Sequence, residues 1–395
     1  MGYTVVQRVV TSDEWAYSYL DRFARKAKLL YNAALFRIRN IFTGYDKDHR
    51  TENEAEIFAE VQLLQDSYPG KAVRKVVTYY QLEKLLRVTG NPDFFSGLPM
   101  QTAQAVVKSA VSDFRNWLSA LKEYQKHPEK FLGKPKMPKY KKTEVCTFGF
   151  SNQDVVLYPQ DTGVQVKLPM TRQRLSFSNL SADACLREVK VKPYYGRYLL
   201  LLTFQEADPV LAAEMPHSCA IDFGTDNFAA IVCGDQSSVI YKGGAVLSSC
   251  QWFHKQRAKL VGILTKGSTH KNASSRQLTS LSYHHANFIK DQCHKISRSI
   301  ISFCLEHQAG TLVSKADVTA GDYLPTYGVD DGNASFSGKR LKRGLYRCHD
   351  GRLVNADCNG AANILRKVFP DIWRRTGDFG FLATPEVVGF HQLNP

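Results

Sequence analysis

The spacing of hydrophobic residues changes along the chain and first predicts a strand followed by helices. Residues 3–10 alternate with the two-residue period of a strand. From Trp15 to Phe42 the apolar residues recur at helical spacing, after a cap-like Thr11-Ser-Asp-Glu14. Further helices are predicted at residues 53–67, 76–88 and about 101–124. The first 130 residues are therefore predicted to hold a helical domain inserted after a single strand.

The stretch from residue 131 to 210 has a different texture, with short strand-like runs separated by Gly and Pro. A hairpin is predicted at Pro193-Tyr-Tyr-Gly196. The predicted strands are 155–158, 163–168, 175–177, 186–192 and 197–205. These runs predict a small β-barrel, which the strand at residues 3–10 would complete.

From about residue 211 the pattern combines strands with long helices, as in an α/β domain. The predicted strands lie at about 219–223, 228–233, 237–242 and 310–314. The predicted helices lie at about 248–266, 276–307 and 357–369. A polar loop of about forty residues precedes the last helix, and we expect little regular structure after Trp373. Together the three stretches predict an α+β multidomain protein.

The charge of the chain points to an anionic partner. The formal net charge is +15 and the pI is near 9.3, and cations that neutralise phosphates gain free energy from released counterions. Two strips concentrate these cations, with Tyr140 and Tyr346 interleaved for stacking. The strips are Lys134, Lys136, Lys139, Lys141 and Lys142, and Lys339, Arg340, Lys342, Arg343 and Arg347. The simplest alternative for either strip is a solvated surface.

Secreted, membrane and zinc-binding proteins fit the sequence poorly. No signal peptide is evident, and the longest apolar run, Tyr198 to Phe204, is too short to cross a bilayer. We therefore expect a cytoplasmic protein with no membrane partner. The nine cysteines include no C-x-x-C pair, and Cys348 and Cys358 lack the paired spacing of a zinc site. We expect no zinc, and reduced, buried cysteines.

Two aspartates are the candidate catalytic and metal-binding residues. Asp222 ends an apolar strand, and Gly224 then lets the backbone turn. Asp357 opens the last predicted helix. A strand-ending Asp before Gly is usually only a turn. A second acidic motif at the far end of a β-β-β-α…α array favours a ribonuclease-H-like site, in which carboxylates hold magnesium and cut a phosphodiester.

Short motifs spread over nearly the whole chain point to one family. In the N-terminal half they are Leu30-Tyr-Asn-Ala-Ala34, Val77-Thr-Tyr-Tyr-Gln-Leu82, Leu98-Pro-Met-Gln-Thr-Ala-Gln104 and Gly133-Lys-Pro-Lys-Met-Pro-Lys-Tyr-Lys141. In the C-terminal half they are Ile221-Asp-Phe-Gly224, Phe336-Ser-Gly-Lys-Arg-Leu-Lys-Arg-Gly-Leu-Tyr-Arg347 and Asn355-Ala-Asp-Cys-Asn-Gly-Ala-Ala-Asn363. With these motifs the chain resembles the TnpB (OrfB) family of transposon-encoded RNA-guided nucleases, which are related to type V CRISPR effectors.

The resemblance implies domains, partners and residue roles. The implied domains are a wedge-type β-barrel (1–10 and 131–210), an inserted helical recognition domain (11–130), a shortened RuvC-like domain (211–375) and a tail (376–395). A bacterial, nucleoid-associated protein is implied, acting as a monomer on a guide RNA and binding double-stranded DNA beside a short adjacent motif. The residues expected to read that motif are Tyr79, Tyr80, Gln81, Gln101 and Gln104. For Tyr79 and Tyr80 a plain core position is an equal alternative.

The chain departs from the family pattern where a third acid is expected. In the family a glutamate follows the strand that corresponds to Thr311–Ser314, or a later strand supplies it. Here the next residue is Lys315, and Asp317 sits too far along to replace the glutamate. A lysine weakens the binding of divalent ions. Any magnesium at Asp222 and Asp357 is therefore not expected to support cleavage.

The sequence thus predicts an RNA-guided DNA-binding protein that has lost its nuclease activity and represses transcription by occupying its target. One alternative is an active, magnesium-dependent RNA-guided endonuclease that uses an unrecognised third carboxylate. A second alternative is a basic protein that binds nucleic acid without a guide.

Overall fold

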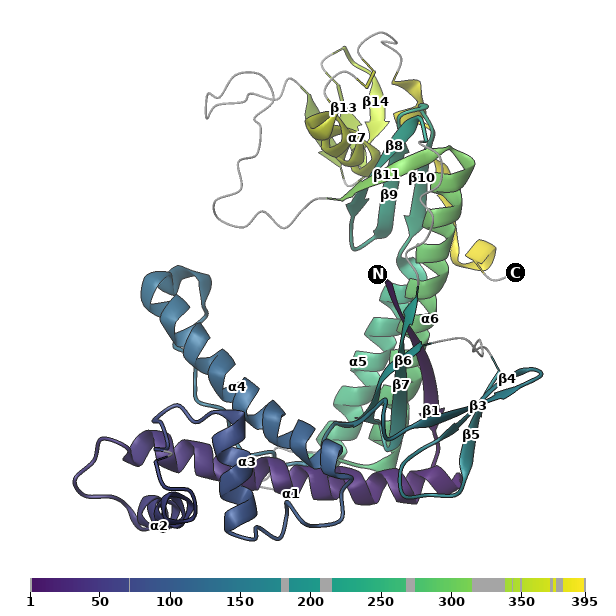
Figure 1. The fold of residues 1–395 in the computed structure, drawn as a ribbon. Helices are drawn as coiled ribbons and strands as arrows, with labels where there is room; N and C mark the ends of the chain where they lie inside the picture. Colours follow the sequence, from purple (N-terminus) through teal and green to yellow (C-terminus); the bar gives the residue numbers. More distant parts are fainter. Residues whose placement is uncertain are drawn as a thin grey trace. The chain divides into compact units, whose positions relative to one another are not determined.

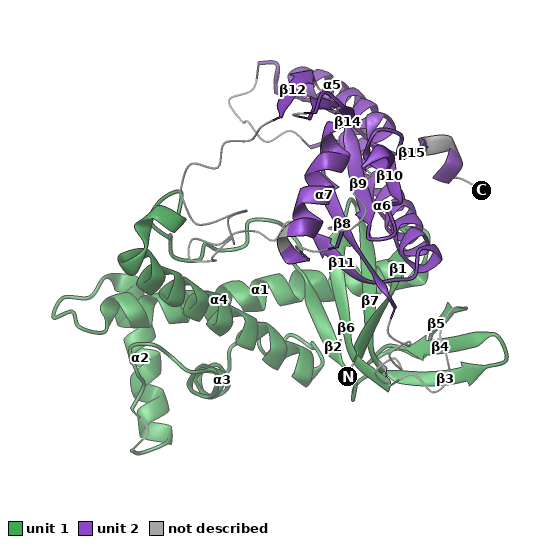
Figure 2. Cartoon of the chain, turned by 90° about the horizontal axis from the view of Figure 1, so that it is seen from above, with its two compact units in different colours: residues 1–209 green, residues 210–395 purple. Residues whose placement is uncertain are grey.

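The computed structural model describes most of the chain, and this part forms two compact units. The described residues are 2–70, 72–178, 185–206, 215–267, 274–314, 338–342, 344–348, 350–369, 372–373 and 379–393. The units are Met1–Pro209 and Val210–Pro395 (Figure 2). Both contain helices and sheets, so the predicted α+β class is confirmed.

Unit 1 begins with one strand and four α-helices, which can be followed in Figure 1. The longest helix buries one apolar stripe, which includes Leu20, Phe23 and Ala27. The Phe23 ring meets the rings of Phe148 and Phe150 edge to face, which joins the helices to a sheet. The elements are β1 (Gly2–Val10), α1 (Trp15–Gly44), α2 (Glu52–Ser67), α3 (Tyr79–Val88), α4 (Met100–Lys126) and the 3-10 turn η1 (Pro128–Lys130).

The described strands of unit 1 pair as two sheets, not as the single closed barrel that the sequence predicted. One sheet has the order β1-β7-β6-β2 and the other β3-β4-β5. Their inner side chains share one core with α1 and α4. β1 is antiparallel to β7, with Val10 beside Tyr198, so the first strand does join the later ones as expected. The strands are β2 (Phe148–Ser151), β3 (Val156–Gln160), β4 (Gly163–Lys167), β5 (Arg174–Phe177), β6 (Cys185–Tyr194) and β7 (Arg197–Glu206).

A five-stranded sheet of order β11-β8-β9-β10-β15 forms the centre of unit 2 (Figure 1). The helix α6 covers one face with Ile296 and Ile300, and α7 covers the other with Ala361 and Leu365. β11 runs parallel to β8, as expected for strands joined by helices. The elements are β8 (His217–Phe223), β9 (Asn227–Cys233), β10 (Ser238–Lys242), α5 (Gly244–Thr265), α6 (Arg276–Glu306), β11 (Ala309–Ser314) and α7 (Ala356–Val368).

The C-terminal segment is structured, so the expectation of little order after Trp373 is wrong. The strand β15 (Glu386–Val388) pairs in parallel with β10, between the 3-10 turns η2 (Gly380–Leu382) and η3 (Phe390–Leu393). The Trp373 indole donates a hydrogen bond to the Gly234 carbonyl at 3.1 Å. These contacts form only when the segment packs on the sheet, and no local sequence pattern reports them.

The predicted forty-residue loop also contains a small sheet. The strands β12 (Lys339–Lys342), β13 (Leu345–Arg347) and β14 (Leu353–Asn355) pair antiparallel directly before α7. Lys315, Asp317 and Arg343 lie outside the described residues.

Two further expectations concern the burial of the cysteines and the lack of a segment that could cross a membrane. All nine thiols are free, but only Cys219, Cys233, Cys304 and Cys358 are buried, so the expectation of burial holds for four of them. Among the described helices, none is both long and apolar enough to cross a bilayer.

Candidate nucleic-acid interface

Asp222 and Asp357 lie where α7 packs on the sheet. A Cβ added at Gly360 of α7 would lie 2.6 Å from Asp222 Oδ2, so the carboxylate approaches the helix at a position without a side chain. Asp357 is three residues earlier and therefore on the same helix face. The Asn355 side chain caps this helix end by accepting from the backbone N–H groups of Asp357 and Cys358. The structure thus brings both predicted aspartates to one helix–sheet junction.

Asp357 is surrounded by hydrogen-bond donors and cations. Nδ2 of Asn227, which is 8% exposed, donates to Asp357 Oδ2 at 2.6 Å. Asn227 Oδ1 accepts a hydrogen bond from Lys242 Nζ at 3.1 Å. Nη2 of Arg340 lies 3.9 Å from Asp357 Oδ1. Asn227 and Lys242 were not identified from the sequence, because they come together only through the pairing of β9 with β10.

The described residues do not fit a two-magnesium centre. Such a centre takes carboxylates from several residues, because two divalent ions must be held and neutralised. Among the described side chains, no group of three or more His, Cys, Asp and Glu is placed to hold a metal ion. Instead, the Asp357 carboxylate accepts from an amide and faces a guanidinium.

The strand that would lead to a third acid is described up to Ser314. Val313 pairs with Ala220, and Ser314 pairs with Ile221, the residue before Asp222. Because Lys315 and Asp317 lie outside the described residues, the place of Lys315 beside Asp222 stays a prediction.

The first cationic strip lies in a segment of unit 1 without helix or strand, and it is here called the lysine strip. Pro135 and Pro138 exclude a helix, and neighbouring side chains fix the backbone instead. The Trp117 indole donates to the Pro135 carbonyl at 3.1 Å, and Arg39 donates to the Pro138 carbonyl at 3.2 Å. The strip consists of Lys134, Lys136, Lys139, Lys141 and Lys142, all of them exposed.

The far end of the lysine strip is fixed to α1. Asn32 donates to the Lys141 carbonyl at 3.1 Å and accepts from the Lys141 amide at 2.8 Å. None of the five lysines has a carboxylate partner among the described residues. At about 3 Å per extended residue the strip spans roughly 25 Å, enough to follow several phosphates of one strand. The lysine strip is therefore a row of cations whose backbone is fixed by hydrogen bonds to neighbouring side chains.

The second cationic strip has a mixed environment. Lys339, Arg340, Lys342 and Arg347 are exposed on β12 and β13. Arg340 is the residue that faces Asp357, so it serves the aspartate site as well. The Tyr346 ring, expected to stack, is partly buried against the core beneath α7. Arg343 lies outside the described residues.

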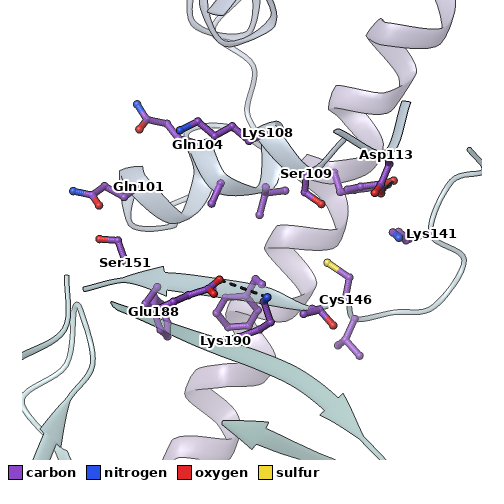
Figure 3. A pocket seen from close by; sticks show the side chains of 18 of the residues that line it. Gln101, Gln104, Lys108, Ser109, Asp113, Lys141, Cys146, Ser151, Glu188 and Lys190 are labelled. Atoms are coloured by element: carbon purple, nitrogen blue, oxygen red, sulfur yellow. Dashed lines mark hydrogen bonds and ion pairs between the residues drawn. The ribbon is translucent and has the colours of Figure 1, made fainter. Parts of the chain in front are cut away.

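A groove of about 1130 Å³ lies between α4 and the sheet of β2 and β6 in unit 1 (Figure 3). Its charged lining consists of four cations and two carboxylates, namely Lys108, Lys141, Arg187, Lys190, Asp113 and Glu188. Gln101 and Gln104 of α4 also line this groove, and their spacing of three residues puts them on one helix face. Burial raises the pKa of the Cys146 thiol in the groove to about 11, so this thiol is neutral near pH 7.

The residues predicted to read an adjacent DNA motif are in different situations. Gln104 lines the groove, and its side chain has no hydrogen-bond partner among the described residues. Gln101 also lines the groove and donates to the Gln153 side chain at 2.6 Å. Tyr80 is 75% exposed, whereas Tyr79 packs against the core of unit 1.

Gln81 has a structural role that engages both ends of its amide. Its Oε1 accepts from the Thr78 backbone N–H at 3.1 Å, and its Nε2 donates to the Ala72 carbonyl at 2.9 Å. Thr78 and Gln81 form a capping box at the start of α3. We therefore do not retain Gln81 among the proposed motif-reading residues.

The fold is mixed α+β, and the site is a candidate nucleic-acid interface. A family comparison indicates which class of protein the chain resembles. Residues 207–319 match the family model OrfB_IS605, described as a probable transposase. The matched segment runs from before β8 to just beyond β11 and includes Asp222. The match covers less than a third of the chain, so it shows a likeness of this segment to that family. No curated protein matches the chain.

Two solved structures share a distant likeness with the chain. One is a cryo-EM structure of a Cas12f1–sgRNA–target DNA complex, 12% identical over 76% of this chain and 65% of that chain, with a TM-score of 0.45. The other is a cryo-EM structure of a CRISPR-Cas12f ternary complex, 10% identical over 75% and 63%, with a TM-score of 0.27. The chain spans slightly less than two thirds of the length of each.

Proposed function

We propose that this chain is directed by a guide RNA to double-stranded DNA, occupies its target without cutting it, and thereby represses transcription. The family match and the net charge of +15 support a nucleic-acid partner. The absence of cleavage rests on one observation, the engagement of Asp357 by Asn227 and Arg340. A carboxylate held in this way is a structural group at the junction of α7 and the sheet.

The physical argument is a competition for the same oxygens. A magnesium ion at Asp357 Oδ2 would compete with the Asn227 amide, which also accepts from Lys242. Moving that amide leaves the lysine without its acceptor. A positive ion would also meet Arg340 close by, and like charges repel at short range. The network therefore favours the metal-free carboxylate.

The domain roles that we propose follow the family pattern. Residues 1–10 and 131–210 form the wedge domain, residues 11–130 recognise the adjacent motif, residues 211–375 are RuvC-like, and residues 376–395 complete the last domain. The lysine strip and the exposed cations of β12 and β13 contact phosphates. The protein acts as a monomer on its guide RNA, in association with the nucleoid.

Cleavage and occupancy can be measured on one target. The protein is purified with its RNA, the RNA is sequenced, and a plasmid carrying the matching site is incubated with magnesium. We expect specific binding of the plasmid, no cutting, and repression of a reporter placed downstream of the site. The Asp222→Ala variant should repress as well as the unchanged protein, because the carboxylate has no catalytic role.

Two outcomes would replace this proposal. Guide-dependent cutting that is abolished by Asp222→Ala would establish the active-endonuclease alternative. Purified protein that carries no discrete small RNA, yet binds DNA and RNA without sequence preference, would establish the guide-independent alternative.

We further propose that the groove reads the adjacent motif through Gln104. A glutamine amide can pair with one base edge in two places, and such a contact contributes about 1–3 kcal/mol of discrimination. Gln104→Ala should therefore reduce the preference for the motif by about 5- to 150-fold, measured by binding to a library of flanking sequences. Gln81→Ala is the matched control and should destabilise α3 without changing the preferred motif. Equal loss of preference in both variants would exclude a specific role of Gln104.

A further inference from the structure

The outer face of the sheet β3-β4-β5 has an unusual composition. The inner residues Val164, Val166, Leu175 and Phe177 are buried in the core of unit 1. The residues between them point outward, because successive side chains of a strand alternate between faces. On this outer face lie Tyr158, Gln165, Lys167 and Arg174, with Arg172 in the turn before β5.

Tyr158 and Arg174 form a stacked platform on this face. The Arg174 guanidinium carbon lies 3.7 Å from the centroid of the Tyr158 ring. Arg174 Nη1 also donates to Gln165 Oε1 at 3.3 Å, which fixes the orientation of the guanidinium. A guanidinium stacked on a ring in this way leaves its second planar side available, and such planes stack on unpaired bases.

Two cations of this face lie directly opposite each other on neighbouring strands. Lys167 and Arg174 are direct cross-strand partners in the register of β4 and β5, and like charges in that arrangement destabilise a sheet. Among the described residues, neither they nor Arg172 has a carboxylate partner. A bound anion between the two strands would offset this repulsion, so the arrangement favours a phosphate-bearing ligand.

A hollow of about 590 Å³ adjoins the platform. Lys167 and Arg172 line it, and its one carboxylate, Asp154, lies near the Ser151 hydroxyl at 3.5 Å. Met170 at its rim is 66% exposed and has a φ of 56°. That backbone region is costly for a residue with a side chain and is often held at binding sites.

We propose that this face binds one unpaired nucleotide of a single strand, with its base on the Arg174 guanidinium and its phosphate between Lys167 and Arg172. The site is distinct from the lysine strip and from the groove beside α4. It rests on the proposed function only for the source of the strand, which is an unpaired part of the guide RNA or the displaced DNA strand. Both sources present the same base and phosphate chemistry.

The test uses the full-length protein freed of co-purified nucleic acid. Binding of a short unstructured RNA and of a DNA of the same sequence is measured over a range of salt concentrations. Tyr158→Leu should weaken binding by about 5- to 150-fold, the loss expected for one stacked base, because the ring holds the Arg174 guanidinium in place. Lys167→Gln and Arg172→Gln each remove a proposed phosphate contact and should each lower the slope of log Kd against log salt by about 0.7. Arg174→Gln should weaken binding because it removes the plane on which the base stacks.

Arg25→Gln is the matched control, because it removes the same charge from a cation that is already paired with Asp21 and Glu144. Its salt slope should equal that of the unchanged protein. Photocrosslinking with a thiouridine-containing RNA should label the peptide that carries Tyr158 or Arg174. RNA bound more tightly than DNA would assign the strand to the guide, and the reverse would assign it to the displaced strand.

Unchanged affinity and salt slope in the Tyr158, Lys167 and Arg174 variants would overturn the proposal and make this face an ordinary solvated surface. That result would leave guided occupancy of double-stranded DNA intact, because repression of the reporter measures it separately. Loss of repression with normal single-strand binding would overturn guided occupancy and leave the nucleotide site on this face intact. The two proposals can therefore fail independently.

Discussion

Replacing all five lysines of the lysine strip with glutamine should weaken nucleic-acid binding about a thousandfold at low salt. Each cation that neutralises a phosphate contributes about 0.7–0.9 to the slope of log K against log salt. Five such contacts should lower the slope by about 4, since these lysines have no carboxylate partner among the described residues. The measurement is the affinity of the RNA-bound protein for its target DNA between 50 and 200 mM salt, about the range over which such contacts act strongly.

A control of equal charge separates this effect from net charge alone. Five cations that already form ion pairs are replaced by glutamine: Arg25, Lys75, Arg87, Lys130 and Lys295. Because these cations are neutralised by a neighbour, their loss should change the affinity by less than about tenfold. Equal losses in both variants would show that the strip acts only through the overall charge of the chain.

The elements with a clear period could be predicted from the sequence. α1 was expected from Trp15 and ends at Gly44, two residues beyond the prediction. α7 was expected at 357–369 and spans Ala356–Val368. Local spacing determines such elements, because a helix or strand with one apolar face carries its period within a few turns. The pairing partners of the strands depend on residues far apart in the chain, so they were harder to predict from the sequence.

Short strands and their closure into sheets were the main errors. β2 is a four-residue strand, too short to show a period, and β15 has three residues. The expected closed barrel required hydrogen bonds between the β1-β7-β6-β2 and β3-β4-β5 sheets, and the described strands pair only within each sheet. Sheet order is a property of packing that the period of one strand does not contain.

For the site, the sequence predicted the positions but not the partners. The motifs placed Asp222 and Asp357 on one strand and one helix, and the structure brings that strand and helix together. The donors around Asp357 come from β9 and β12, whose pairing the sequence did not reveal. In contrast, the role of Gln81 was available, because Thr78-x-x-Gln81 has the spacing of a capping box. A helix was predicted at residues 76–88, but Gln81 was assigned to DNA recognition and not to the cap of that helix.

The C-terminal segment provides a second test with a large expected effect. Trp373 is 5% exposed, contacts Phe379 and Phe381, and donates its indole N–H to the Gly234 carbonyl. Trp373→Ala removes a large buried ring and leaves that carbonyl without this donor. We expect unit 2 to lose about 3–5 kcal/mol of unfolding free energy, or roughly 10 °C in Tm for a unit of this size.

Trp252→Ala is the matched control, because the same side chain is 57% exposed there on α5. It should change stability by no more than about 0.5 kcal/mol. A lower Tm could arise from loss of the packed C-terminal segment alone or from weakening of the whole core of unit 2. Hydrogen exchange distinguishes these two causes, because β15 pairs with β10 only while the C-terminal segment stays packed. In Trp373→Ala the amides of β10 and β15 should exchange faster than those of β8. Uniform acceleration across the whole sheet would mean that the ring supports the core in general and does not specifically hold the C-terminal strand.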